Sequence, residues 1–189
     1  MELECTLVYR SRFIIRAYEG WTSATDRVLD IGCGNAVVTD ELRRYFGFCV
    51  EGTDVMDYRR RPVSYRPMTG PGHLACRDGE FDVCMLNDVL HHCQDWKAVL
   101  REALRVGKRV LIFEVEPTLL ARLGDWLVNK IHNPRISVAL GMQRPQQWQE
   151  HFGREGWRFE FRRISQPKWY PFVNFAFQVT ASDVRGETR

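Results

Sequence analysis

The chain has 189 residues, of which 44% are hydrophobic, 27% charged and 12% aromatic, and its net charge is +3. This composition predicts a single globular domain over residues 1–189 and excludes a mainly disordered chain. The sequence has no run of about 18 apolar residues, which excludes a membrane span, and its acidic start at Glu2 and Glu4 differs from the basic start of a signal peptide. We therefore expect a cytoplasmic protein without integral membrane contact.

Helices and strands alternate over the first two thirds of the chain. Apolar positions recur at helical spacing within 6–19, and Gly20 ends that helix. The elements expected after it are, in order, a buried strand over 27–31, a helix over 36–46, strands over 48–53 and 63–66, a buried strand over 81–86, a helix over 95–106 and a strand over 109–115. This alternation with short glycine turns predicts a parallel sheet that helices cover on both faces.

The last third of the chain has a different pattern. Two helices are expected over 118–131 and 145–153. Two runs of alternating apolar and polar residues, 157–162 and 173–179, predict an antiparallel pair at one edge of the sheet. The predicted fold is α/β: a Rossmann-like three-layer sandwich with a seven-stranded, mostly parallel sheet and an antiparallel C-terminal hairpin.

Neither the cysteines nor the basic residues indicate a ligand by themselves. The six cysteines form no CxxC pair and have no metal-type spacing, so we expect reduced, buried thiols and no metal. Arg59, Arg60 and Arg61, with Arg66 nearby, are the densest basic cluster. Because prolines stand beside the cluster, we interpret it as a solvated loop, with a phosphate-binding patch as the alternative.

A glycine turn follows the first buried strand. Gly32 and Gly34 stand between that strand and the next helix, where the backbone must bend tightly and approach a ligand closely. The third glycine of a dinucleotide fingerprint would fall at Val37, so the turn argues against NAD. The carboxylate of Asp30 would repel a pyrophosphate but suits a ligand that carries an ammonium or sulfonium group.

Asp54 stands at the end of the second strand of the predicted sheet. In a parallel sheet of this type, an acid at that place accepts hydrogen bonds from two ribose hydroxyls. Because Asp30 and the glycine turn belong to the same pattern, Asp54 predicts a ribose-containing ligand rather than an ordinary turn at a strand end.

Three segments carry a resemblance to a known family. They are 28–34 (VLDIGCG), 52–54 (GTD) and 81–92 (FDVCMLNDVLHH). Through them, residues 25–116 resemble the class I S-adenosylmethionine-dependent methyltransferases, in particular small enzymes similar to the ubiquinone and menaquinone C-methyltransferases. The resemblance implies S-adenosylmethionine as the cofactor, S-adenosylhomocysteine as the product and a small-molecule acceptor.

The resemblance also implies which residues bind this cofactor. These residues would contact the methionine part, the ribose, the adenine and the reactive methyl of the cofactor: Asp30, Gly32, Cys33, Gly34, Asp54, Val55, Thr69, Asn87 and Val89. The loop 68–76 lacks the acid that holds the adenine amine in the family, so Thr69 or a backbone carbonyl is expected to replace it.

Methyl transfer from a sulfonium is an in-line displacement, so the protein has to align the acceptor and, for a hydroxyl, remove a proton. Family members that use a histidine place it where this chain has His91, which is our candidate base. Tyr18 closes the first helix, which covers the substrate mouth in the family, and its phenol would contact the substrate or pair with His91. The alternatives are that His91 only begins the next connection and that Tyr18 packs in the core. His132 and His151 are expected to be structural.

The acceptor is expected to lie under the helix at 1–20 and the segment 117–152. An apolar stripe in that segment predicts a helix packed on the sheet or its lid, with a substrate pocket or a membrane surface as alternatives: Leu119, Leu120, Leu123, Trp126, Leu127 and Ile131. The expected function is methylation of a small aromatic or apolar acceptor at oxygen, carbon or nitrogen, by a monomer or homodimer.

Three other functions are weighed against this one. They are a nicotinamide-dependent oxidoreductase, an S-adenosylmethionine-binding partner subunit without catalysis and an RNA-modifying methyltransferase. Nucleic acid is disfavoured as a partner, because 87–90 (NDVL) lacks the Pro-Pro-aromatic platform on which a flipped base would stack.

Overall fold

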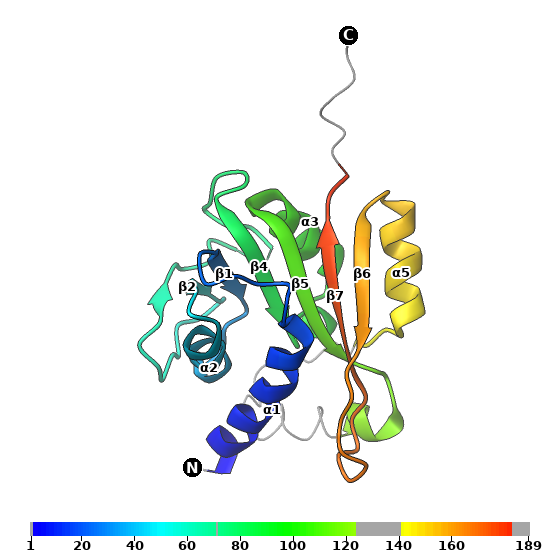
Figure 1. Cartoon of the computed structure of the whole chain (residues 1–189). Helices are drawn as coiled ribbons and strands as arrows, with labels where there is room; N and C mark the ends of the chain where they lie inside the picture. The colour runs from blue at the N-terminus through cyan, green and yellow to red at the C-terminus, as the bar shows by residue number, and fades with distance from the viewer. Residues whose placement is uncertain (1, 71, 124–140, 183–189) are drawn as a thin grey trace.

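Seven strands form one sheet in the computed structural model, which describes residues 2–70, 72–123 and 141–182. The strands are β1 (Arg27–Ile31), β2 (Cys49–Thr53), β3 (Ser64–Tyr65), β4 (Phe81–Asn87), β5 (Gly107–Val115), β6 (Arg158–Arg163) and β7 (Asn174–Thr180). Their order is β3-β2-β1-β4-β5-β7-β6; the first five are parallel, and β7 is antiparallel to both β5 and β6. The predicted sheet with its antiparallel C-terminal hairpin is confirmed (Figure 1).

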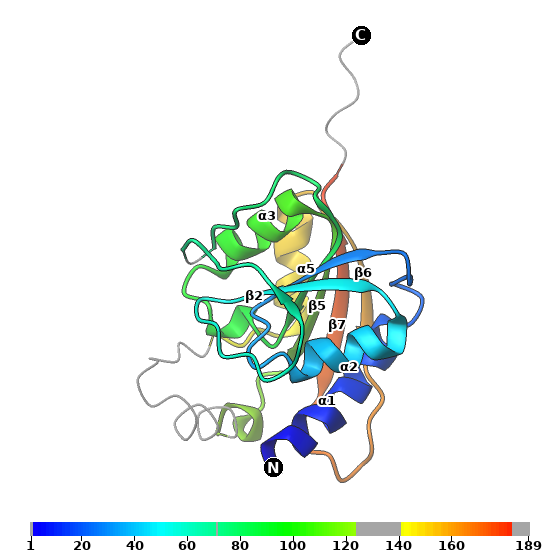
Figure 2. The same cartoon turned by 90° about the vertical axis from the view of Figure 1, so that its left-hand side faces the viewer.

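Helices cover both faces of the sheet, as Figures 1 and 2 show. The helices α1 (Glu2–Tyr18) and α2 (Val37–Phe46) lie on one face, and α3 (Trp96–Val106) and α5 (Pro145–Arg154) lie on the other. Side chains of β4 alternate between the two cores: Val83 and Met85 pack with α1 and α2, whereas Cys84 and Leu86 pack with α3 and α5.

The carboxyl ends of the parallel strands define one end of the molecule. In Figure 1 the arrowheads of β4 and β5 point to the end where α1 begins. The second half of α1 is buried in the core through Phe13, Ile14, Ala17 and Tyr18. A short 3-10 helix, η1 (Leu90–His92), follows β4 at the same end.

No loop separates α3 from β5. The sequence pattern predicts a strand that starts at Arg109, but β5 starts at Gly107, directly after the last residue of α3. A Cβ atom at Gly107 would lie 2.7 Å from Cys84 Sγ and 3.1 Å from the carbonyl oxygen of Ala103. Glycine therefore lets the chain turn from helix to strand without a connecting residue.

The expectation that the apolar stripe of the segment 117–152 packs on the sheet is wrong for the three leucines that the structure describes. Residues 119–123 are helical, but the first three leucines of the predicted stripe do not pack on the sheet: Leu119, Leu120 and Leu123 are 89%, 51% and 61% exposed. Ala121 is buried with Val115 and Met142, so the helix contacts the protein through its smallest side chain and its leucines face outward. Trp126, Leu127, Ile131 and His132 lie outside the described residues. Among the described residues, no helix is long and apolar enough to cross a membrane.

Candidate active site

The glycine turn between β1 and α2 adopts a backbone that favours glycine. Gly32 has φ +78° and Gly34 has φ +54°, both in the left-handed region. A Cβ atom at Gly32 would lie 2.6 Å from Cγ2 of Val89, which follows β4, whereas a Cβ atom at Gly34 would meet nothing within 4 Å. Gly32 is thus required by packing against the end of β4, and the space beside Gly34 is open to a ligand.

Asp54 joins the end of β2 to this turn. Its Oδ2 atom accepts a hydrogen bond from the Gly34 amide at 2.8 Å, and its Oδ1 atom accepts one from the Val55 amide at 2.7 Å. Burial raises the pKa of Asp54, and these backbone donors oppose that shift. The Cys33 side chain packs beside Gly52, where an added Cβ atom would lie 2.8 Å from Cys33 Sγ. Cys33 is buried as expected, but the expectation of buried thiols is wrong for Cys5 and Cys49, which are exposed.

Sequence reasoning missed the strain at Ala36. The dinucleotide fingerprint would place its third glycine at Val37, but Ala36 is the residue with φ 60°, at the start of α2. A left-handed conformation costs an alanine about 1 kcal/mol or more. Ala36 follows Gly34 at the same two-residue spacing at which Gly34 follows Gly32, and this repeat is the signal that could have identified the position as one that favours glycine.

Asp30, Asn87 and Tyr18 form a buried chain of hydrogen bonds. The Tyr18 hydroxyl donates to Asn87 Oδ1 at 2.8 Å, and Asn87 Nδ2 donates to Asp30 Oδ1 at 3.3 Å. Asp30 Oδ2 accepts a 2.5 Å hydrogen bond from the Thr39 hydroxyl. Burial raises the pKa of Asp30 to about 7, against the opposing effect of Thr39 and Asn87. Burial, with the charges of Asp30, Asp88 and Glu114, raises the pKa of Tyr18 well above its usual value, so Tyr18 acts here as a donor to Asn87.

A partly buried arginine connects α1 to the residue after β4. The Nε and Nη2 atoms of Arg10 each donate to one oxygen of Asp88 at 2.5 Å, and Nη1 donates to the Tyr170 hydroxyl at 3.0 Å. The guanidinium also lies 5.2 Å from the centroid of the Phe113 ring. Asp88 has φ 56°, a conformation that aspartate tolerates better than most residues. Helical spacing is the signal that could have separated Arg10 from the exposed Arg12 and Arg16, because Arg10 lies on the same helix face as the apolar residues at 13, 14 and 17.

His91 is buried and paired with an acid that sequence reasoning missed. His91 Nδ1 lies 2.5 Å from Glu114 Oε2, and the amide of Leu90 donates to Glu114 Oε1 at 3.0 Å. His91 and Glu114 are each 2% exposed. The signal for Glu114 is present in the sequence, because it is the one acid within the apolar run 110–115.

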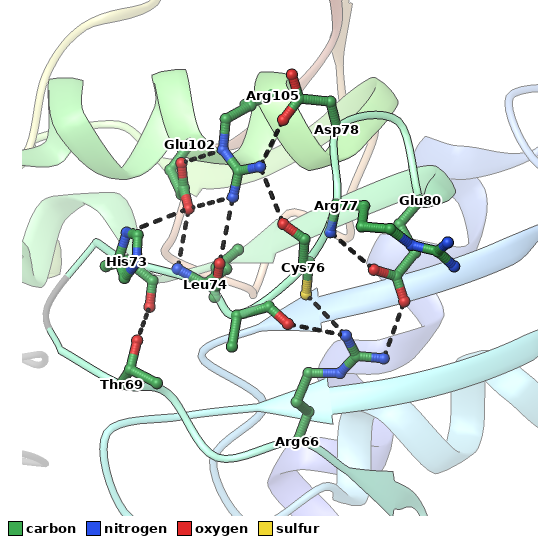
Figure 3. A network of polar contacts seen from close by, with 11 residues as sticks. Arg66, Thr69, His73, Leu74, Cys76, Arg77, Asp78, Glu80, Glu102 and Arg105 are labelled. Carbon is green, nitrogen blue, oxygen red and sulfur yellow. Dashed lines mark hydrogen bonds and ion pairs between the residues drawn. The ribbon is translucent and has the colours of Figure 1, made fainter.

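Side chains hold the loop 66–80 against α3 (Figure 3). Arg105 donates to the carbonyl oxygens of Leu74 and Cys76, and Arg66 donates to that of Ala75. Thr69, the expected adenine contact, directs its hydroxyl to the carbonyl oxygen of His73 at 3.2 Å. The glycine-rich loop is therefore anchored from two sides.

The arginine cluster at 59–66 is divided among separate acidic partners. Arg59 pairs with Asp57, Arg61 with Glu4, and Arg66 with Glu51 and Glu80. These ion pairs offset much of the positive charge that a phosphate-binding patch would need.

His151 is buried beside the rings of Trp96 and Trp157.

The strand ends form an acidic site. Asp30, Asp54 and Glu114 are buried there, and among the described residues none of them has a lysine or arginine ion-pair partner; Arg10 pairs with Asp88. The charges of Asp54 and Glu114 both act on the Cys93 thiol, whose pKa burial raises to about 11. Hydrogen bonds join Tyr18 of α1 to Asn87 of β4 and Asn87 to Asp30 of β1, and the charge of Glu114 on β5 also acts on Tyr18.

Two surface grooves lie away from this site. The larger, of about 510 Å³, runs between α1 and α2 and is lined by residues such as Arg12, Arg16 and Glu41. Neither groove includes a residue of the predicted cofactor-binding set.

Solved structures share the fold over most of the chain at low sequence identity. A possible histamine N-methyltransferase from Thermotoga maritima superimposes with a TM-score of 0.64 and 17% identity, covering 92% of this chain and 91% of that one. Magnesium protoporphyrin IX methyltransferase from Synechocystis PCC 6803, solved with bound S-adenosylhomocysteine, gives 0.61 and 15%, covering 93% and 83%. The [4+2]-cyclase SpnF gives 0.66 and 14%, covering 90% and 80%.

A curated relative and a family model match the sequence itself. Ubiquinone biosynthesis O-methyltransferase from Caulobacter sp. (strain K31) is 28% identical over 116 residues, which cover 52% of this chain and 46% of that protein. The match thus spans slightly less than half of the relative's length. The model of a family described as a methyltransferase domain matches residues 9–164. The chain therefore belongs to the methyltransferase domain family, and its fold is that of the class I S-adenosylmethionine-dependent enzymes.

Proposed function

We propose that this protein transfers a methyl group from S-adenosylmethionine to a small aromatic or apolar acceptor. The observation that carries the proposal is the acidic site at the strand ends, where Asp30 and Asp54 are buried without a cationic partner among the described residues. Such a site favours a ligand with an ammonium and a sulfonium group and disfavours the pyrophosphate of NAD.

The residues at the site fit this cofactor. Asp54 holds its two oxygens in place through the amides of Gly34 and Val55 and keeps further lone pairs for two ribose hydroxyls. The open space beside Gly34 lets the backbone approach the ligand, and Asp30 would face its positive end. When bound, S-adenosylmethionine supplies an electrophilic methyl group on a sulfonium sulfur.

The proposed acceptor is a phenol or another small apolar nucleophile. The curated relative that matches part of this chain is named as a ubiquinone biosynthesis O-methyltransferase. In our proposal His91 takes the hydroxyl proton, which makes the acceptor oxygen a stronger nucleophile for the methyl carbon.

Calorimetry tests the cofactor, and turnover tests the reaction. We expect S-adenosylhomocysteine to bind and NAD to give no signal; NAD binding without S-adenosylhomocysteine binding would contradict the proposal. Turnover is then measured across a panel of phenols, quinols and amines. His91→Ala should lower turnover and leave S-adenosylhomocysteine affinity unchanged, and full activity would remove His91 from the mechanism.

A second candidate is a cofactor-binding protein without methyl transfer. The similar fold of a protein named as a [4+2]-cyclase favours keeping it, since this fold also occurs in a protein named for other chemistry. Stabilisation by S-adenosylhomocysteine together with no turnover across the panel would support this candidate.

A further inference from the structure

We propose that Glu114 is a positioning residue that fixes the tautomer of His91 and thereby makes Nε2 its basic nitrogen. The proposal rests on the proposed methyl transfer, in which His91 accepts a proton. Glu114 itself does not touch the acceptor; it acts through the imidazole ring.

Each carboxylate oxygen of Glu114 contacts one partner. Oε1 accepts the amide of Leu90, which fixes the carboxylate against η1, and Oε2 faces His91 Nδ1 at 2.5 Å. An ionised carboxylate only accepts hydrogen bonds, so Nδ1 must carry the ring proton in this contact. The lone pair of the neutral ring is then on Nε2.

Among the groups around Glu114, His91 is the one that could carry a positive charge to balance the carboxylate. The ring of His92 lies 3.9 Å from that of His91, centroid to centroid. The Glu114 charge also acts on the Cys93 thiol and, from α1, on the Tyr18 hydroxyl, which are both neutral. Among the described residues, Glu114 has no lysine or arginine ion-pair partner, so an imidazolium at His91 is the cation that it would stabilise.

The acceptor hydroxyl gives its proton to Nε2, and the ring becomes an imidazolium beside the Glu114 carboxylate. An electron pair of the acceptor oxygen forms the new bond to the methyl carbon, while the pair of the carbon–sulfur bond stays on sulfur. The positive charge has moved from the sulfonium to the ring.

Nitrogen-detected NMR of histidine-labelled protein tests the assignment without any acceptor. In the wild-type protein we expect neutral His91 to carry its proton on Nδ1. In Glu114→Gln, the amide oxygen retains the Leu90 contact and the amide nitrogen faces Nδ1, so the proton should move to Nε2. A wild-type spectrum with the proton on Nε2 would overturn the proposal, and it decides the question even if the variant does not fold.

Kinetics then separate positioning from a structural role. Glu114→Gln should lower turnover about 100-fold or more, because the wrong ring nitrogen is basic, with S-adenosylhomocysteine affinity unchanged. Glu116→Gln is the matched control, since Glu116 lies just beyond β5 and pairs with Arg163; it should change neither the tautomer nor turnover. Unchanged turnover in Glu114→Gln would overturn the proposal. Failure of the wild type to bind S-adenosylhomocysteine would instead count against the proposed function.

Discussion

The two halves of the site are held together in different ways. On the β1 and β2 side, the turn at Gly32 and Gly34 bonds to Asp54 through a backbone amide, within one βαβ unit. On the β4 and β5 side, side chains from distant segments meet: Arg10 reaches Asp88, and His91 reaches Glu114. The first half depends on backbone conformation, and the second depends on tertiary structure that places single side chains opposite one another.

This difference has a consequence for substitutions. In the first half, the damaging changes are those that alter backbone conformation or remove Asp54. In the second half, removal of one partner leaves the other without its hydrogen bonds, so effects of paired substitutions should not add. Four experiments test this contrast.

Gly32→Ala should be the most damaging change to the half of the site that depends on backbone conformation. The added Cβ atom combines a left-handed φ of +78° with a 2.6 Å approach to Val89 Cγ2. We expect a loss of about 3 kcal/mol in the free energy of unfolding, measured by urea denaturation. Gly34→Ala is the matched control, because its Cβ atom meets nothing within 4 Å, and it should cost only about 1 kcal/mol. If Gly32→Ala/Val89→Ala does not recover part of the loss, the steric explanation is wrong.

Asp54→Ala should remove most cofactor binding with a smaller effect on the fold. A buried carboxylate that accepts two ribose hydroxyls contributes about 3 kcal/mol, which corresponds to about a 100-fold weaker dissociation constant for S-adenosylhomocysteine in calorimetry. Asp57→Ala, an exposed acid in the same loop that pairs with Arg59, is the control and should bind normally. Equal affinity in Asp54→Ala and wild type would refute the ribose assignment.

Arg10→Met should destabilise the half that depends on side chains. It leaves the Asp88 carboxylate without its bidentate partner, which we expect to cost about 2 kcal/mol of unfolding free energy. Arg10→Met/Asp88→Asn should cost less than the sum of the two single changes. Arg12→Met, on the exposed face of the same helix, should stay within about 0.5 kcal/mol of wild type. Additive losses would show that Arg10 and Asp88 do not act as a pair.

The pH dependence of cofactor binding should report Asp30. Its folded pKa of about 7 lies above the unfolded value of 3.8, so protonated Asp30 favours the fold. This stabilisation is full below pH 3.8 and is lost as pH rises through 7. A cationic ligand needs the ionised form, so the affinity for S-adenosylmethionine should fall about tenfold from pH 8 to pH 6.

Asp30→Asn is the variant that checks this assignment. It should bind S-adenosylmethionine weakly and without this pH dependence, and in the ligand-free state it should be more stable than wild type at pH 8. A wild-type affinity that is constant between pH 6 and pH 8 would contradict the role of Asp30.

The sequence predicts the parts of the molecule that rest on local pattern. The strands, the glycine turn and the position of Asp54 follow from periodicity and spacing within short segments. The pairing of Arg10 with Asp88 and that of His91 with Glu114 do not, because these contacts span 78 and 23 residues. The outward direction of Leu119 was also unpredictable, since it depends on the burial of Ala121 against Val115. Ligand contacts of the predicted cofactor-binding set remain predictions.

Because α3 runs directly into β5, the number of residues at their junction determines which side chains of β5 reach the site. Phe113 faces Arg10 and Glu114 bonds to His91 because neighbouring side chains on a strand point to opposite faces. Gain or loss of one residue between Val106 and Gly107 would turn every side chain of β5 to the opposite face of the sheet, so Glu114 would move to the face of Arg10 and Phe113 to the face of His91. No loop is present there to absorb the change. The junction should therefore tolerate many changes of side chain in α3 but not a single-residue insertion.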